Sequence, residues 1–181
     1  MTKAEKTRGA LLNNARALQW RYGYSNVTLR QIAKAAGVDV ALVSRYFGGK
    51  LGLFEATLEG AFEFPRVDGP EDLVDLVVHL FTSHPRDSPE PTILHLLLMN
   101  AQDEEVGPLV REAQHSAMQT GIEAALGDSP RAALFMAAIL GMTVAEKSMF
   151  LSGIAPCESP VYEAQLRHML NAAISYKAPT V

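Results

Sequence analysis

The sequence has few of the features that define whole classes of protein. Its 181 residues include one cysteine, Cys157, so no intramolecular disulfide can form and a reducing, cytoplasmic setting is favoured. No stretch of about 18 uncharged apolar residues occurs, which predicts no membrane span. No basic segment followed by an apolar run begins the chain, so we expect no secretory signal peptide. Internal repeats and low-complexity segments are absent as well.

The short motifs of common catalytic and nucleotide-binding sites are also missing. The chain has no Gly-x-Ser-x-Gly, no Gly-x-x-x-x-Gly-Lys, no Gly-x-Gly-x-x-Gly and no His-Glu-x-x-His. The histidines do not follow a compact metal-ligand pattern. We therefore expect a protein that is not an enzyme and that uses no cofactor and no metal.

The most informative stretch is residues 28–50, TLRQIAKAAGVDVALVSRYFGGK, which predicts two short helices joined by a tight turn. Thr28 and Gln31 have the spacing of a capping box at the start of the first helix. Gly37 follows where the end of a helix needs a left-handed residue, and Asp39 can cap the second helix. This pattern is typical of a helix-turn-helix, whose second helix enters the major groove of duplex DNA.

The charge distribution favours the same interpretation. Residues 1–50 hold nine of the 16 Lys and Arg residues but two of the 20 acidic residues, a net charge of +7. The remainder carries −11, which gives the overall −4. A basic segment attached to an acidic body suggests that the first part alone meets a polyanion. The alternative is a solvated helical face with a chance excess of Lys and Arg.

Beyond residue 50 apolar residues recur at helical spacing, and no alternation typical of strands is found. The pattern predicts an all-α protein with three parts. These are a helix-turn-helix DNA-binding domain at 1–50, a connecting helix at 50–64 and a helical ligand-binding and dimerisation domain at 65–181. Prolines stand at three predicted helix starts, where a missing N–H costs nothing. The later helices are expected at about 92–100, 108–126, 130–151 and 160–175.

The segment from Lys6 to Leu58 resembles the N-terminal domain of TetR-type transcriptional regulators. The resemblance rests on motifs that occur in the family's order and spacing, namely Gly23, Thr28, Ile32-Ala33, Ala36-Gly37-Val38, Phe47 and Lys50. Two positions depart from the family pattern, because Ser44 stands where members usually have a Tyr and Leu42 where they often have a small polar residue. The resemblance implies a dimer joined through a four-helix bundle of the last helices.

Roles in DNA binding follow from side-chain chemistry. Lys50, with the N–H groups that begin the next helix, is expected to hold a phosphate. Arg45 is the favoured reader of guanine, because a guanidinium donates two bonds to N7 and O6. Val40, Ala41 and Leu42 offer apolar contact with thymine methyl groups. The hydroxyls of Thr28 and Tyr46 are expected to contact phosphates. Ser44 and Arg30 can each reach either a phosphate or a base edge.

The second domain supplies candidates for two further surfaces. A small-molecule pocket is expected among large, soft, aromatic or imidazole side chains, namely His79, Leu97, His115, Met118, Phe135 and Met142. A homodimer interface is expected on the last two helices, at Ala137, Gly141 and Ala145 and at Leu166, Met169 and Ala173. For both sets the alternative is an ordinary internal core.

Together these observations predict a one-component regulator of transcription. We expect a repressor that binds a pseudo-palindromic operator in double-stranded DNA as a homodimer and is released by a small, largely apolar molecule. The alternatives are an activator, a regulator without a ligand, and a helical module whose basic end docks an acidic protein. Phosphate contacts would make DNA affinity fall steeply with salt, whereas protein docking would depend on salt more weakly.

Overall fold

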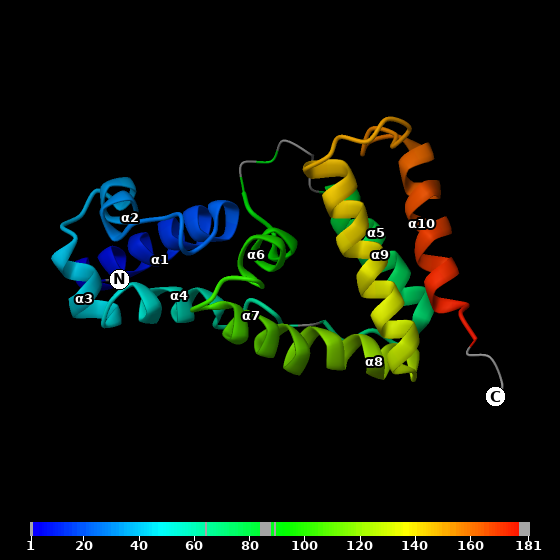
Figure 1. Cartoon of the computed structure of the whole chain (residues 1–181), viewed down its shortest axis with the longest axis horizontal. Helices are drawn as coiled ribbons and strands as arrows, with labels where there is room; N and C mark the ends of the chain where they lie inside the picture. Colours follow the sequence, from blue (N-terminus) through cyan, green and yellow to red (C-terminus); the bar gives the residue numbers. More distant parts are fainter. Residues whose placement is uncertain (1, 64, 84–87, 89, 178–181) are drawn as a thin grey trace. The chain divides into compact units, whose positions relative to one another are not determined.

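The computed structural model describes residues 2–63, 65–83, 88 and 90–177, and every secondary-structure element within them is helical. Figure 1 shows the helices in chain order. They are α1 (Lys3–Tyr22), α2 (Leu29–Ala36), α3 (Ala41–Phe47), α4 (Lys50–Leu58), α5 (Pro70–Ser83), α6 (Ile93–Asn100), α7 (Gly107–Ala113), the π-helical η1 (Gln114–Gln119), α8 (Thr120–Leu126), α9 (Ser129–Lys147) and α10 (Pro160–Ile174). The predicted all-α class is confirmed. None of the helices in the described ranges is long and apolar enough to cross a membrane.

Some helix ends differ from the sequence expectation for local reasons. The helix that begins at Lys50 stops at Leu58, ahead of Gly60, which adopts a left-handed φ of 67°. The helix expected over 130–151 ends at Lys147, where the N–H groups of Ser148 and Met149 both donate to the Val144 carbonyl. The segment expected as one helix over 108–126 contains the π-helical turn of η1.

The chain forms two compact units that do not follow a single cut in the sequence. Unit 1 comprises Met1–Glu63 together with Glu90–His115, and unit 2 comprises Phe64–Pro89 together with Ser116–Val181. The sequence expectation placed everything after residue 65 in the second domain. The difference arises because α6 packs on α1 and α7 packs on α4, so both helices belong with the N-terminal segment.

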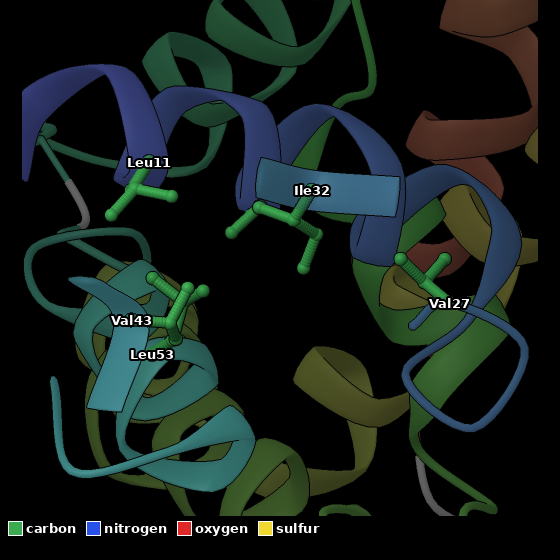
Figure 2. Packing of buried hydrophobic residues seen from close by; sticks show 6 residues of the cluster. Leu11, Val27, Ile32, Val43 and Leu53 are labelled. Carbon is green, nitrogen blue, oxygen red and sulfur yellow. The ribbon is translucent and has the colours of Figure 1, made fainter. Parts of the chain in front are cut away.

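Unit 1 has a core to which each of its first four helices contributes one apolar face. Figure 2 shows Leu11 of α1, Ile32 of α2, Val43 of α3 and Leu53 of α4 gathered around a shared interior. Val27, from the turn between α1 and α2, joins them. All five side chains are buried. Truncating a buried Leu or Ile to Ala typically costs about 2–5 kcal/mol, so this core fixes the angle at which α3 is presented.

In unit 2 the helix α10 packs on α9 and α5, and α8 packs on α9 and α5. Its core includes Phe135, Tyr162 and Leu166, which are fully buried. The Tyr162 hydroxyl donates to the buried Glu146 carboxylate at 2.7 Å, which satisfies two polar groups that burial would otherwise penalise. The regular helices of this unit are thus tied together by both apolar and polar contacts.

Candidate nucleic-acid interface

Residues predicted from the sequence form the start and the end of α2, the first helix of the helix-turn-helix. The Thr28 hydroxyl accepts from the Gln31 backbone N–H at 3.3 Å, and the Gln31 side-chain oxygen Oε1 accepts from the Thr28 N–H at 2.7 Å, so the capping box is confirmed. Gly37 ends α2 with a φ of 68°, a left-handed conformation that a Cβ would strain. Asp39 accepts from the Ala41 N–H at 2.7 Å, but the N-cap of α3 is Val40, whose side chain makes no capping bond.

Helix α3 presents a mixed face to solvent. Val43 is fully buried, whereas Val40, Ala41, Ser44 and Arg45 are exposed, as the helical spacing predicts. The Arg45 guanidinium carbon lies 5.9 Å from the centroid of the neighbouring Tyr46 ring. The exposed edge of α3 therefore combines apolar groups, a hydroxyl and a guanidinium, the chemistry that reads base edges in a major groove.

Two of the predicted contact residues are drawn partly inward. Leu42 and Tyr46 are half-buried and pack against the apolar core of unit 1. Their side chains therefore support α3 as well as bordering its exposed face. Thr28 and Arg30 are exposed at the start of α2.

The connection from α3 to α4 is unusually tight. Gly48 and Gly49 both have positive φ values, 75° and 136°, so neither position suits an L side chain. A Cβ on Gly52 would overlap the Phe47 carbonyl oxygen and lie 3.2 Å from its carbon. Glycine at 52 thus allows the first turn of α4 to approach the end of α3, and this contact places Lys50 immediately beyond α3.

Lys50 is not a free surface cation. Its ammonium nitrogen lies 4.1 Å from the centroid of the Tyr24 ring, a cation–π geometry. Burial lowers the Lys50 pKa, and the nearby carboxylates of Glu105 and Asp103 partly oppose that effect. Local sequence patterns gave no sign of these partners, because a chain-distant turn brings Asp103 and Glu105 to this position.

A second contact that the sequence did not suggest joins α1 to α3. The Arg8 guanidinium carbon lies 5.0 Å from the centroid of the Phe47 ring at the end of α3. Arg8 is exposed, as are Lys3 and Lys6 in the first turns of α1. The basic residues of α1 therefore extend to the carboxyl end of α3.

The residues expected to line a small-molecule pocket have varied surroundings. Leu97, Phe135 and Met142 are buried, and Met118 is half-buried. His79 and His115 are exposed in the single chain. By the division of the chain, Leu97 and His115 belong to unit 1 and the other four residues to unit 2. No group of three or more His, Cys, Asp or Glu within the described part of the chain has a geometry that could hold a metal ion.

The two faces expected at a dimer interface separate clearly. On α9, Ala137 and Gly141 are exposed, and Ala145 is half-buried. On α10, Leu166 and Ala173 are buried and Met169 is half-buried, because α10 packs on α9 and α5. Leu166 and Ala173 are therefore core residues of unit 2, and a second chain cannot reach surface that the first already buries.

Comparison with known proteins agrees with this geometry. Residues 11–57 match the family described as bacterial regulatory proteins, tetR family. No curated protein sequence matches the chain significantly.

Solved structures share the fold over nearly the whole chain. Two crystal structures of NalD, the secondary repressor of the MexAB-OprM multidrug efflux pump in Pseudomonas aeruginosa, superpose with TM-scores of 0.68 and 0.66 at 22% and 24% identity, each covering 94% of this chain and 96% of NalD. A tetR-family transcriptional regulator from Streptomyces coelicolor superposes with a TM-score of 0.59 at 25% identity, covering 93% of this chain and 80% of that protein. The N-terminal domain of this chain is therefore that of the TetR family of bacterial regulatory proteins, and the chain as a whole has the fold of its transcriptional regulators.

Proposed function

We propose that this protein is a ligand-responsive transcriptional repressor that binds a two-fold operator as a homodimer. The observation that carries the proposal is the arrangement of α3 and Lys50. Helix α3 presents Arg45 to solvent, and its close contact with α4 places Lys50 at the amino end of the next helix. Base-reading and phosphate-holding groups thus lie next to each other on one rigid unit.

Each side chain has a defined task on DNA. Lys50 and the N–H groups that begin α4 hold a phosphate through charge and the helix dipole. Arg45 donates two bonds to a guanine, while Val40 and Ala41 contact thymine methyl groups. Thr28, Arg30, Ser44, Leu42 and Tyr46 complete the contact surface at its edges.

Dimerisation is supported by the exposed face of α9. Ala137 and Gly141 leave room for close approach of a second helix, and Leu134 on the same helix is 42% exposed. Val161 of α10 adds an exposed apolar side chain, and the half-buried Ala145 and Met169 border these faces. A two-fold operator requires two α3 helices on successive major grooves, about 34–36 Å apart, and one chain supplies a single such helix.

The proposed effector is a small, largely apolar molecule. Within unit 2, buried Phe135 and Met142 provide soft, apolar walls of the kind that ligand sites use, and half-buried Met118 with His79 adds polarisable and polar groups. The shared fold with NalD, a repressor by its description, favours repression over activation. A difference of about 1–3 kcal/mol in effector affinity between the DNA-bound and free conformations would switch operator occupancy.

The deciding experiment selects bound duplexes from a random pool with the full-length protein. We expect a two-fold consensus and a linear fall of log affinity with log salt. The Lys50→Ala variant should bind all duplexes more weakly and flatten that slope by about 1, because one phosphate contact is lost. Lys177→Ala, an exposed lysine in unit 2, is the matched control and should leave the slope unchanged.

Recovery of no enriched sequence at low salt would refute DNA recognition and favour docking of an acidic protein. A consensus without two-fold symmetry would refute the dimer. If the selected duplex is recovered but no apolar compound releases it, the repressor acts without an effector of this class.

A further inference from the structure

A buried asparagine fastens a chain-distant segment to the end of α1. The Asn100 side chain is fully buried, and its carbonyl oxygen accepts from the Tyr24 N–H at 2.7 Å. Its amide nitrogen donates to the Gln19 carbonyl at 3.1 Å and to the Leu96 carbonyl at 3.1 Å. The amide thus joins the end of α6 to the last turn of α1 and to the turn that follows it. Removing this buried side chain is costly, because the Tyr24 N–H would lose its acceptor, although the Gln19 carbonyl would still accept from the Gly23 N–H.

Asp103 makes a second connection, to Ser25, the residue that follows Tyr24 in the turn after α1. The Ser25 hydroxyl donates to Asp103 at 2.6 Å, while the N–H groups of Glu105 and Val106 donate to its other oxygen at 3.0 and 3.1 Å. Burial acts to raise the Asp103 pKa, but the bonds from Ser25, Val106 and Glu105 outweigh it and lower the pKa. Asp103 is therefore held as a carboxylate, tied both to its own turn and to the turn between α1 and α2.

Tyr24, whose N–H is bonded by Asn100 and which precedes Ser25, also contacts Lys50 through its ring. Tyr24 is buried, its ring meets Phe54 edge-on at 5.3 Å between centroids, and the Lys50 ammonium lies over it at 4.1 Å. Burial and a hydrogen bond to Glu105 raise the Tyr24 pKa to about 12, so the phenol stays neutral at physiological pH. The position of the Lys50 ammonium therefore depends on the Tyr24 ring. Asn100 fixes the backbone of Tyr24, and Asp103 fixes the next residue, Ser25.

We propose that Asn100 and Asp103 are positioning residues for DNA binding, which act by fixing Tyr24 and, through its ring, the ammonium of Lys50. The proposal rests on the proposed DNA-binding function. The turn after α6 would then have two opposite effects on the affinity for DNA. The hydrogen bonds strengthen binding because they preorganise Lys50, whereas the carboxylate charge weakens binding because it competes with the incoming phosphate.

A double-mutant cycle on the full-length protein tests the first effect. The probe is a fluorescein-labelled duplex recovered from the random-pool selection, titrated over a range of salt concentrations. Asn100→Ala should weaken binding about tenfold, the scale of a lost buried hydrogen-bond partner. It should also flatten the salt slope by about 1, as Lys50→Ala does. Because both changes remove the same contact, the double variant should bind scarcely more weakly than Lys50→Ala.

A matched control separates positioning from general weakening. Asn14→Ala removes a side-chain bond to the Ala10 carbonyl, which lies within α1 and joins no second segment. This variant should retain the wild-type slope. Asn100→Ala losses that simply add to those of Lys50→Ala, with an unchanged slope, would overturn the proposal, since a merely structural role predicts that result.

Variants of the second connection test the opposite effects of bond and charge. Ser25→Ala removes the bond but keeps the Asp103 charge, so binding should weaken several-fold. Asp103→Asn keeps a bonding partner for Ser25 but removes the charge, so binding at low salt should tighten. Glu104→Gln makes the same charge change at an exposed neighbouring position and should tighten binding less. Equal tightening by Asp103→Asn and Glu104→Gln would overturn the assigned competition with phosphate.

The outcomes distinguish this inference from the function beneath it. If the wild-type protein selects no duplex, DNA binding itself is refuted. If the wild type binds and both Asn100→Ala and Ser25→Ala match its affinity and slope, the positioning role alone is refuted. Helix content and melting temperature are measured for each variant. If Asn100→Ala does not fold, Ser25→Ala, which alters an exposed side chain, decides the question.

Discussion

Replacing Gly52 by alanine tests the contact that sets Lys50 against α3. The new Cβ would overlap the carbonyl oxygen of Phe47, a backbone atom that no side-chain rotation can move away. Restoring van der Waals separation requires α4 to shift outward by roughly 1 Å. Overpacking of this kind costs about 1–3 kcal/mol, and the better helix propensity of alanine returns up to about 1 kcal/mol. We therefore expect a net loss of up to about 3 kcal/mol in the free energy of unfolding, with a central value of about 1.5 kcal/mol.

Gly9 provides the matched comparison in the same unit. It lies inside α1, and an added Cβ would meet nothing within 4 Å. Gly9→Ala should therefore stabilise the protein by about 0.5–1 kcal/mol through helix propensity alone. One chemical change thus has opposite expected signs at two positions of unit 1.

Thermal unfolding followed by circular dichroism and calorimetry measures the difference. For a chain of this size about 1 kcal/mol shifts the melting temperature by about 2–4 °C, so the two variants should lie on opposite sides of the wild type. DNA affinity should fall for Gly52→Ala, because the shift of α4 moves Lys50 relative to α3. Equal stability of the two variants with wild-type DNA affinity would refute the close approach of α4 to Phe47.

Four further outcomes are expected. Arg45→Ala should relax base preference at one position in each operator half-site, as read by repeating the duplex selection, and uniformly weaker binding would make Arg45 a backbone contact. Gly141→Leu should shift the protein toward monomer in analytical ultracentrifugation, and an unchanged dimer would remove that face of α9 from the interface. Thr28→Ala should lower the free energy of unfolding by about 1 kcal/mol through loss of the capping box, measured by urea denaturation. The bonds from Ser25, Val106 and Glu105 hold the pKa of the Asp103 carboxyl below its ordinary value, so its stabilising contribution is present above about pH 4 and is lost as pH falls through the lowered pKa. The Ser25→Ala protein should therefore lose less stability over that acid range, and an identical acid response would contradict the Ser25 bond.

Local chemistry explains why much of unit 1 was predictable. The capping box at Thr28, the left-handed Gly37 and the buried Val43 each depend on residues within one or two helical turns. Spacing along the chain therefore contains the information that builds them. Helix starts at prolines followed the same logic, since the missing N–H is needed by no partner there.

What the sequence did not predict depends on contacts between distant segments. Asn100 looks like the end of an ordinary helix until the fold brings it to Tyr24, 76 residues away. Lys50 reads as a free cation until the Tyr24 ring and the carboxylate of Glu105 surround it. Leu166 and Ala173 form an apolar stripe that could serve either a core or an interface, and packing of α10 on α9 and α5 assigned both residues to the core.

The discontinuity of unit 1 has a practical consequence for chimaeric regulators. A fragment cut after residue 63 would leave the surfaces of α1 and α4 that α6 and α7 cover open to water, and would leave the Tyr24 N–H without its acceptor. Moving unit 1 onto the effector domain of another regulator therefore requires three crossover points, after residues 63, 89 and 115, so that residues 90–115 stay with the first 63. A chimaera joined only after residue 63 would lack residues 90–115, so the Tyr24 N–H would not have Asn100 as its acceptor.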